Sequence, residues 1–250
     1  MNDSPASADG DIYDPAFVAD LFDRCSANYR RWSAVSSFGF IHLWRRQCVS
    51  RLRRPMAPGA AVVDLMAGTG EIWPHVLRRF PDIGAITAID ISHRMHLEAL
   101  ERLHRRYAHR ISHIEADALR VDLPTEQADI VVSTFGLKTF DARRQTVLAG
   151  QIARILKPGG QFSLIEASDP KGWILRPLYR FYLDRMLPMI ERFFLRGAND
   201  FSMIGAYTRN FGDSRHMEAA LRDAGLSVTF RRHFFGCATS VAGYKPVTAG

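Results

Sequence analysis

One short stretch, AVVDLMAGTGE at residues 61–71, constrains the fold of this chain more than any other. An apolar run leads into Asp64, a loop of small residues follows, and the next residues suit a helix. This order predicts a buried parallel strand that ends in a tight strand-to-helix turn. Gly68 and Gly70 lack a Cβ, which lets a ligand approach the backbone closely. Since open α/β sheets bind ligands outside the carboxyl ends of their strands, we expect the binding site at this turn.

The turn does not match two common phosphate-binding patterns. The dinucleotide pattern G-x-G-x-x-G needs a third glycine at position 73, where Trp73 stands. A Walker-type phosphate loop needs a lysine after the glycines, and none follows here. The remaining pattern, Asp-x-x-x-Gly-x-Gly, indicates a ligand that the loop does not bind through a pyrophosphate group.

Two further strand ends carry acidic residues. The predicted strand at 86–89 ends in Asp90, and the one at 111–115 is followed by Asp117 and Ala118. An acidic residue at the first of these ends is placed to accept from both ribose hydroxyls of a nucleoside. At the second, Asp117 can accept from an adenine amino group while the Ala118 N–H bonds the ring. Glycine, aspartate and aspartate at three strand ends favour adenosine without phosphates, which indicates S-adenosylmethionine as cofactor.

Further motifs extend from about residue 15 to 246. They are LFD to Tyr29 at 21–29, SFG to WR at 37–45, the glycine loop, DIS at 90–92, FGL at 135–137, LKPGG at 156–160 and GYK at 243–245. In these motifs and their order, the chain resembles the class I S-adenosylmethionine-dependent methyltransferases, and more closely the ubiquinone/menaquinone C-methyltransferase family. The resemblance implies a Rossmann-like α/β fold with a seven-stranded, mostly parallel sheet. It also implies an N-terminal helical cover and a helical lid between the fifth and sixth strands.

The predicted cofactor site combines the glycine loop with the ends of the next three strands. Its residues are Asp64, Ala67, Gly68, Gly70, Asp90, Ile91, Asp117, Ala118 and Thr134. Thr134 ends the predicted fourth strand at 129–134 and should flank the methionine part of the cofactor. No histidine or cysteine spacing typical of a metal site occurs, so we predict no metal.

Two residues are candidates for catalysis. The resemblance implies that Tyr29 lies near the substrate, although simple packing of its helix is an equal alternative. Lys138 follows the fourth strand, where a cation could stabilise a phenolate; a lysine extending to solvent is the alternative. Glu166, at the end of the fifth strand, is interpreted as a structural hydrogen-bonding group.

Helical periodicity predicts the elements around the sheet. An N-terminal pair is expected at 15–29 and 38–52, and a later helix at 142–156. The basic and glycine-rich segment 157–160 is expected to end that later helix. The lid, about 171–210, contains a helix at 173–194 that is both aromatic and basic. Such a helix can cover a lipophilic substrate, lie on a membrane surface, or only pack on the body with solvated arginines.

The chain departs from the resembled family on the acceptor side. Met66 stands in the glycine loop where many methyltransferases have Gly or Ala. Arg30 and Ser33 replace an aspartate and an asparagine, and Lys138 and Thr139 replace an arginine and an asparagine. A lysine does not reproduce the bidentate geometry of an arginine, so this last change alters how an acceptor is held.

Several functions therefore remain open. The resemblance implies C-methylation of a prenylated quinone or quinol in quinone biosynthesis. The altered acceptor side also suits transfer of an amino group from S-adenosylmethionine to ubiquinone, which gives rhodoquinone. An RNA methyltransferase ranks lower because the Asn-Pro-Pro-Tyr and Pro-Cys motifs are missing, and so does methylation of another small aromatic acceptor. A protein that binds the cofactor without catalysis is a further alternative.

Composition sets the remaining expectations. With 250 residues and 47% hydrophobic content, the chain can form one domain at 13–250 behind a disordered tail at 1–12. The net charge of +7 suits anionic partners such as acidic lipids, but nucleic acid is an unlikely partner. Three cysteines without pairing, and no signal peptide or membrane span, favour a cytoplasmic protein with peripheral membrane contact as an option.

Overall fold

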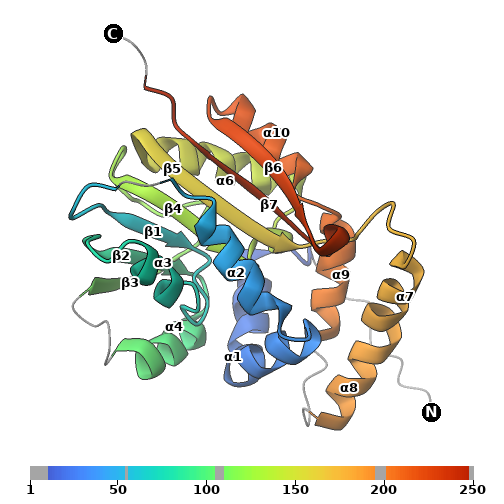
Figure 1. Ribbon diagram of the computed structural model, residues 1–250. Coiled ribbons are helices and arrows are strands. Elements are labelled where there is room, and N and C mark those ends of the chain that lie inside the picture. The colour runs from blue at the N-terminus through green and yellow to red at the C-terminus, as the bar shows by residue number, and fades with distance from the viewer. Residues whose placement is uncertain (1–10, 54–55, 105–109, 195–200, 248–250) are drawn as a thin grey trace.

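The computed structural model describes residues 11–53, 56–104, 110–194 and 201–247. Within these residues, one twisted sheet lies between helices on both faces (Figure 1). Its strands are β1 Val62–Leu65, β2 Ile86–Asp90, β3 Ile111–Glu115, β4 Ala128–Thr134, β5 Leu156–Ala167, β6 Ser227–His233 and β7 Ala238–Tyr244.

The strand order is β3-β2-β1-β4-β5-β7-β6, and only β7 runs antiparallel to its neighbours. This arrangement confirms the predicted seven-stranded, mostly parallel Rossmann-like sheet. The chain first builds outward from β1 to β3 and then returns to the other side of β1 with β4. The connections at β1 and β4 therefore leave the sheet in opposite directions, which opens a crevice at their carboxyl ends.

The two faces of the sheet have separate hydrophobic cores. Helices α2 Phe40–Ser50 and α3 Trp73–Arg79 cover one face, and α6 Ala142–Ile155 and α10 Arg215–Asp223 cover the other. Successive residues of β1 belong to different cores, Val62 to the first and Val63 to the second. Because both faces are covered, the central strands are apolar throughout, as the run before Asp64 predicts.

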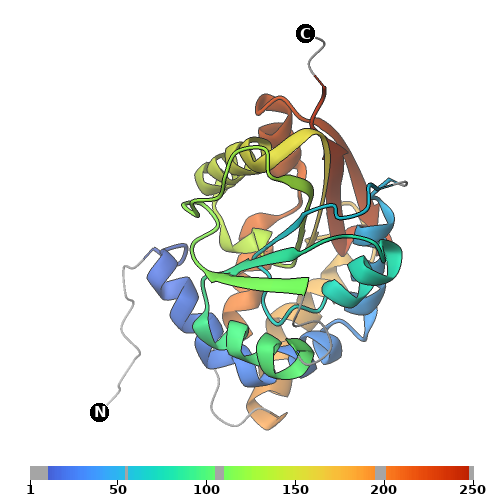
Figure 2. The same cartoon turned by 90° about the vertical axis from the view of Figure 1, so that its left-hand side faces the viewer.

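The N-terminal cover begins with α1 Pro15–Ser36, which lies beside α4 His93–Ala99 (Figures 1 and 2). Asp23 of α1 accepts hydrogen bonds from the Ser92 hydroxyl (2.5 Å) and the Arg94 N–H (3.0 Å). The helix extends beyond the predicted end at Tyr29. It stops because Phe38 and Gly39 both have positive φ, so α2 begins at Phe40.

The lid follows β5, as predicted. It consists of α7 Arg176–Phe181, a π-helical turn Tyr182–Met186, α8 Leu187–Phe194 and α9 Phe201–Phe211. Its buried Tyr207 packs with Leu21, Cys25 and Trp32 of α1, and the Tyr182 hydroxyl donates to the Ser36 carbonyl (3.0 Å). The lid and the N-terminal cover therefore form one side of the molecule together.

Two predictions need correction. Residues 11 and 12 were expected in a disordered tail, but Arg144 forms an ion pair with Asp11 (2.5 Å) and the Tyr207 hydroxyl donates to the Ile12 carbonyl. The rest of the predicted tail, 1–10, lies outside the described residues. Helix α6 ends at Ile155, one residue before the predicted end, but the segment 157–160 is not its last turn: it lies within β5, where it interrupts the pairing with β4 and where Gly159 and Gly160 exchange backbone hydrogen bonds with Lys245.

Candidate functional site

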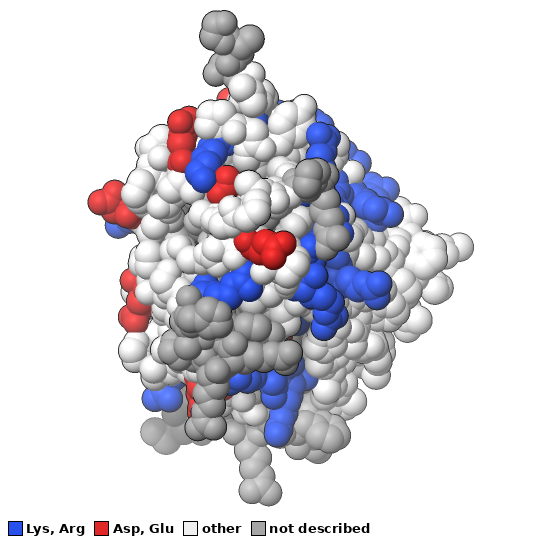
Figure 3. Space-filling view, turned by 60° about the vertical axis from the view of Figure 1, so that its left-hand side comes forward, with Lys and Arg blue, Asp and Glu red and all other residues white. Residues whose placement is uncertain are grey.

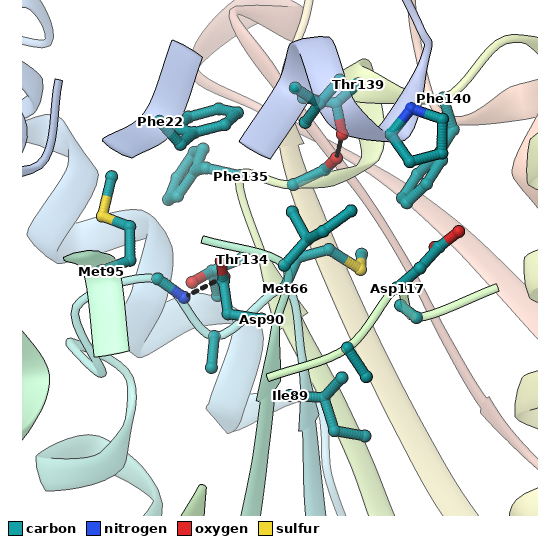
Figure 4. Close-up of a pocket in the computed structure, with 18 of the residues that line it drawn as sticks. Phe22, Met66, Ile89, Asp90, Met95, Asp117, Thr134, Phe135, Thr139 and Phe140 are labelled. Carbon is teal, nitrogen blue, oxygen red and sulfur yellow. Dashed lines mark hydrogen bonds between the residues drawn. The ribbon is translucent and has the colours of Figure 1, made fainter. Parts of the chain in front are cut away.

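A cavity opens at the carboxyl ends of β1 to β4, beneath α1. Figure 4 shows Asp90, Met66 and Asp117 on its sheet side and Phe22 of α1 reaching in from the opposite side. Of the predicted cofactor residues, all but two line this cavity: Ala67, Gly68, Asp90, Ile91, Asp117, Ala118 and Thr134. The fold thus brings together four loops that are far apart in the sequence.

Asp90 offers an anionic acceptor to this first cavity. Its two oxygens accept hydrogen bonds from the Gly68 N–H (2.7 Å) and the Ser92 N–H (2.9 Å). Each carboxylate oxygen has a second lone pair, so both can still accept from a ligand. Burial raises the pKa of Asp90 to about 6, and the carboxylate therefore predominates at neutral pH. Two such acceptors side by side suit a vicinal diol such as ribose.

Asp117 borders the same cavity from the loop after β3. Its Oδ1 accepts from the Leu119 N–H (2.9 Å), which fixes the carboxylate beside Ala118. The two carboxylates come from neighbouring strand ends and face one cavity (Figure 4). The predicted binding of ribose at Asp90 and adenine at Asp117 requires such neighbouring positions and stays a prediction.

The two remaining predicted residues, Asp64 and Gly70, lie behind the glycine loop. Asp64 is buried and its Oδ2 accepts from Trp73 Nε1 (2.8 Å); burial raises its pKa to about 8. Gly70 has φ +71, and a Cβ at this position would lie 2.5 Å from the Trp73 ring. Both residues therefore shape the loop around Trp73, where the sequence alone suggested direct contact.

Two residues at the crevice have unusual backbone conformations. Met66 (φ +53) and Phe135 (φ +65) lie in the left-handed region, which non-glycine residues rarely adopt. They follow β1 and β4, and both line the first cavity. The position of a Gly136 Cβ would be 2.5 Å from Met66 Cβ, so Gly136 makes room for the methionine. Strain of this kind persists where surrounding packing enforces it, often at functional sites.

Three charged residues of the first cavity, Arg45, Glu71 and Arg144, were assigned no role from the sequence, and two of them form a buried pair. Arg45 of α2 is buried and its Nη1 lies 2.8 Å from Oε2 of Glu71, which follows the glycine loop. Arg45 also lies over the Phe135 ring at 5.5 Å. The sequence contained one indication of this role. Arg45 stands next to Trp44 within the apolar stripe of a predicted helix, where a charged side chain needs a partner.

A second cavity of about 400 Å³ lies between the N-terminal cover and the lid. Its wall is mostly apolar and includes Phe38, Phe40, Ile41, Trp44, Trp173, Leu175, Leu178, Tyr179, Tyr182, Met186 and Phe234. Tyr29 and Phe135 line both cavities. The two spaces therefore adjoin: the first includes the carboxylates of Asp90 and Asp117, and the second is mostly apolar.

The two candidate catalytic residues lie at this second cavity. Burial raises the pKa of Tyr29, so its hydroxyl stays protonated at neutral pH and can donate a hydrogen bond. Lys138 is 4% exposed and does not extend to solvent. Its Nζ lies 2.9 Å from Glu166 Oε1 and donates to the Phe135 carbonyl (2.6 Å). Glu166 thus has the structural role preferred from the sequence, as the partner of Lys138.

The charge and apolar residues of the surface are unevenly distributed. On the face drawn in Figure 3, basic side chains gather in the middle and on the right, and acidic ones lie mostly at the left edge. Around the second cavity, several large apolar side chains are exposed: Phe38 (75%), Ile174 (88%), Leu178 (62%), Phe234 (45%) and Phe235 (65%). Among the described helices, none is long and apolar enough to cross a bilayer.

Comparisons with known proteins agree with this geometry. The model of the ubiE/COQ5 methyltransferase family matches residues 11–245. The demethylmenaquinone methyltransferase of Lactiplantibacillus plantarum is 27% identical over 91% of this chain and 95% of its own length. The ubiquinone/menaquinone biosynthesis C-methyltransferase UbiE of Shewanella halifaxensis is also 27% identical, over 91% of this chain and 90% of its own.

Solved structures share the fold at lower identity. The Haemonchus contortus phosphoethanolamine N-methyltransferase 2 in complex with S-adenosylhomocysteine has a TM-score of 0.62 at 16% identity, over 91% of this chain and 60% of its own. The [4+2]-cyclase SpnF has a TM-score of 0.63 at 14% identity, over 92% and 95%. Since a cyclase shares the architecture, the fold alone does not determine the reaction.

Proposed function

The chain belongs to the ubiE/COQ5 methyltransferase family and uses S-adenosylmethionine, and from this premise we propose that it methylates a ring carbon of a prenylated quinol in quinone biosynthesis. The observation that carries the proposal is the pair of adjoining cavities, one suited to the cofactor and one apolar. A prenylated ring needs an apolar space of this kind next to the methyl donor. Two relatives named for this chemistry, each 27% identical, support the same substrate class.

The residues of the first cavity fit the cofactor. The spare lone pairs of Asp90 suit the ribose hydroxyls, and Asp117 with Ala118 suits the adenine edge. No atom lies within 4 Å of a Cβ position at Gly68, so the loop leaves open space there. S-Adenosylmethionine held by these residues would supply an electrophilic methyl group to an acceptor in the neighbouring cavity.

The chain's own contribution is to position the acceptor and exclude water. Tyr29 and Phe135 line both cavities and therefore lie where the acceptor and the cofactor would meet. We propose that the Lys138 ammonium, held by Glu166, stabilises negative charge on an acceptor oxygen as the ring becomes nucleophilic. Tyr29 acts as a hydrogen-bond donor to the same ring. Holding the two reactants in line would supply most of the rate.

The first test is mass spectrometry of the acceptor after incubating the protein with S-adenosylmethionine and a demethylated quinol or ubiquinone. We expect the quinol to gain one methyl group with S-adenosylhomocysteine formed. Replacement of a methoxy group by an amino group, without that by-product, would instead support rhodoquinone formation. A lack of change in both acceptors, with turnover of another small aromatic compound, would contradict the quinone proposal.

A matched variant tests the acceptor side in the same assay. Lys138→Met combined with Glu166→Gln removes both charges of the buried pair and so avoids leaving one unpaired. We expect turnover to fall about 100-fold, the usual loss for one charge-stabilising group. Binding of S-adenosylhomocysteine should stay unchanged, because Lys138 does not line the first cavity. Equal turnover in the variant and the native chain would remove Lys138 from the mechanism.

We also propose that the exposed apolar rim of the second cavity docks on an anionic membrane surface. Phe38, Leu178 and Phe234 line the cavity and are exposed, so they surround its mouth. Trp173 stacks on Phe235 (5.2 Å), which extends the apolar area. Exposed basic residues of the same segments suit anionic headgroups: Lys171, Arg180, Arg185, Arg231 and Arg232. A prenylated acceptor could then enter directly from the bilayer.

Sedimentation with vesicles tests this docking. We expect binding to phosphatidylglycerol vesicles and much less to phosphatidylcholine, because the basic residues need anionic headgroups. Replacing Ile174 and Phe235 by serine should weaken binding about 10-fold or more, since each inserted apolar side chain contributes about 1 kcal/mol or more. Leu97→Ser, at a residue 49% exposed on α4, serves as control. Equal loss in the control, or no vesicle binding at all, would contradict the docking surface.

A further inference from the structure

Arg45 and Glu71 form a buried ion pair with unused hydrogen-bonding capacity. Arg45 is 3% exposed, and the Glu71 side chain is 10% exposed. Although Arg45 Nη1 lies 2.8 Å from Glu71 Oε2, the N–H direction does not make a hydrogen bond. Within the described part of the chain, Arg45 Nε and Nη1 and Glu71 Oε2 have no hydrogen-bond partner. Buried polar atoms that make no hydrogen bond are costly even within an ion pair, so this arrangement needs an explanation.

The location of the pair suggests a ligand. Both side chains line the first cavity. Glu71 belongs to the turn after β1, and Arg45 belongs to α2, which packs against β4 and β5. In the sheet, β2 with Asp90 lies between β1 and β3, so the adenine side at Asp117 is on the far side of Asp90. The pair therefore faces the end of the ligand that lies away from adenine.

We propose that Arg45 binds the α-carboxylate and Glu71 the α-ammonium group of the cofactor's amino-acid end. This inference rests on S-adenosylmethionine as the ligand of the first cavity. A zwitterion supplies one negative and one positive group, which match the unused donors of Arg45 and the unused acceptor of Glu71. The protein thus presents both charges in advance, already close to each other, and the ligand completes their hydrogen bonds. Recognition then depends on the amino-acid end as well as on adenosine.

Arg102 is a control for Arg45, because both arginines lie near Glu71. Its Nη2 lies 3.5 Å from Glu71 Oε1 and donates to the Thr69 carbonyl (2.5 Å). It therefore shares the carboxylate partner of Arg45 and supports the same loop. Unlike Arg45, it does not line the cavity. A purely structural role of the charge network predicts similar effects from both arginines, whereas ligand binding predicts an effect of Arg45 alone.

Calorimetric titration with two ligands tests the proposal. S-Adenosylhomocysteine carries the amino-acid end, and 5′-methylthioadenosine lacks it. In the native chain, S-adenosylhomocysteine should bind at least 10-fold more tightly. Arg45→Gln should weaken S-adenosylhomocysteine binding about 10- to 100-fold, as expected for loss of a charge-assisted hydrogen bond. Binding of 5′-methylthioadenosine should change less than about threefold, and Arg102→Gln should change the ratio of the two affinities little.

The outcomes separate this proposal from the function proposed above. If Arg45→Gln weakened the binding of both ligands equally, or if the native chain bound both with equal affinity, the proposed contacts of Arg45 and Glu71 would be wrong. The assignment of the cofactor to the first cavity would still hold. Failure of the native chain to bind S-adenosylhomocysteine would instead contradict the proposed function. If Arg45→Gln does not fold, decarboxylated S-adenosylmethionine tests the same contact on the native chain. It lacks only the carboxylate and should bind about 10-fold or more weakly than S-adenosylmethionine.

Discussion

Gly70→Ala is expected to destabilise the protein by about 2 to 5 kcal/mol and to abolish cofactor binding. The new Cβ would lie 2.5 Å from the Trp73 ring, which is itself buried and cannot move away freely. Trp73 also donates to Asp64, so displacing the ring breaks a buried hydrogen bond. The positive φ of +71 adds a conformational cost for any residue with a side chain.

Thermal unfolding measures this effect and Gly68→Ala serves as its control. Gly68 also has a positive φ (+54), but nothing lies within 4 Å of its Cβ position. It should lose only about 1 kcal/mol, the conformational part of the cost. We expect Tm to fall by about 5 to 15 °C for Gly70→Ala and by a few degrees for Gly68→Ala. Equal losses would show that Trp73 adapts and that the loop is less tightly packed than its contacts indicate.

Asp90→Asn is expected to weaken S-adenosylhomocysteine binding by about 100-fold or more. The carboxylate has two oxygens that each accept a backbone N–H and keep one lone pair for the ribose. Asparagine has one such oxygen, and its amide nitrogen would face either the Gly68 or the Ser92 N–H, donor against donor. The variant therefore loses charge, one acceptor and part of the loop geometry. Calorimetry measures the affinity, with the exposed Asp122→Asn as control.

The same residue makes cofactor affinity depend on pH. Because burial raises the pKa of Asp90 to about 6, lowering the pH through 6 protonates the carboxyl and removes its anionic acceptors. Affinity should therefore be full above pH 7 and fall about 10-fold near pH 5, one unit below this pKa. Asp90→Asn cannot titrate there and should show a flat profile between pH 5 and 7. A parallel decline in both proteins would assign the pH dependence to another group.

Much of the fold could be predicted from local patterns. Short β-branched runs predicted the ends of the first strands, whereas the seven-stranded, mostly parallel sheet was implied by the resemblance to the family, and the structure agrees with both. The incorrect predictions concern segments whose local sequence preference is overridden by contacts or backbone turns elsewhere. The segment 157–160 has the composition of a helix end, but its backbone pairs with Lys245, a residue far along the chain. Likewise α1 continues past Tyr29 until Phe38 and Gly39 turn the chain.

The residues of the candidate site also fall into those that the sequence could predict and those that it could not. The polar residues that end strands, such as Asp90, Asp117 and Thr134, could be found because parallel strands place their carboxyl ends at one edge. The role of Asp64 could not, since its hydrogen bond to Trp73 depends on how α3 packs. Lys138 was recognised as a cation after a strand end, but its pairing with Glu166 joins the turn after β4 to β5, and no spacing in the sequence encodes that contact.

By itself, the sequence determined the sheet, the glycine loop and the kind of ligand that its strand ends can hold, because these depend on residue type and short-range periodicity. Only the tertiary structure decided which charges are buried together. Arg45 and Glu71 come from a helix and a loop that meet at the first cavity, and Tyr29 and Phe135 come from distant segments that both line the first and the second cavity. Such contacts arise from the packing of distant segments, where burial and charge compensation select the partners.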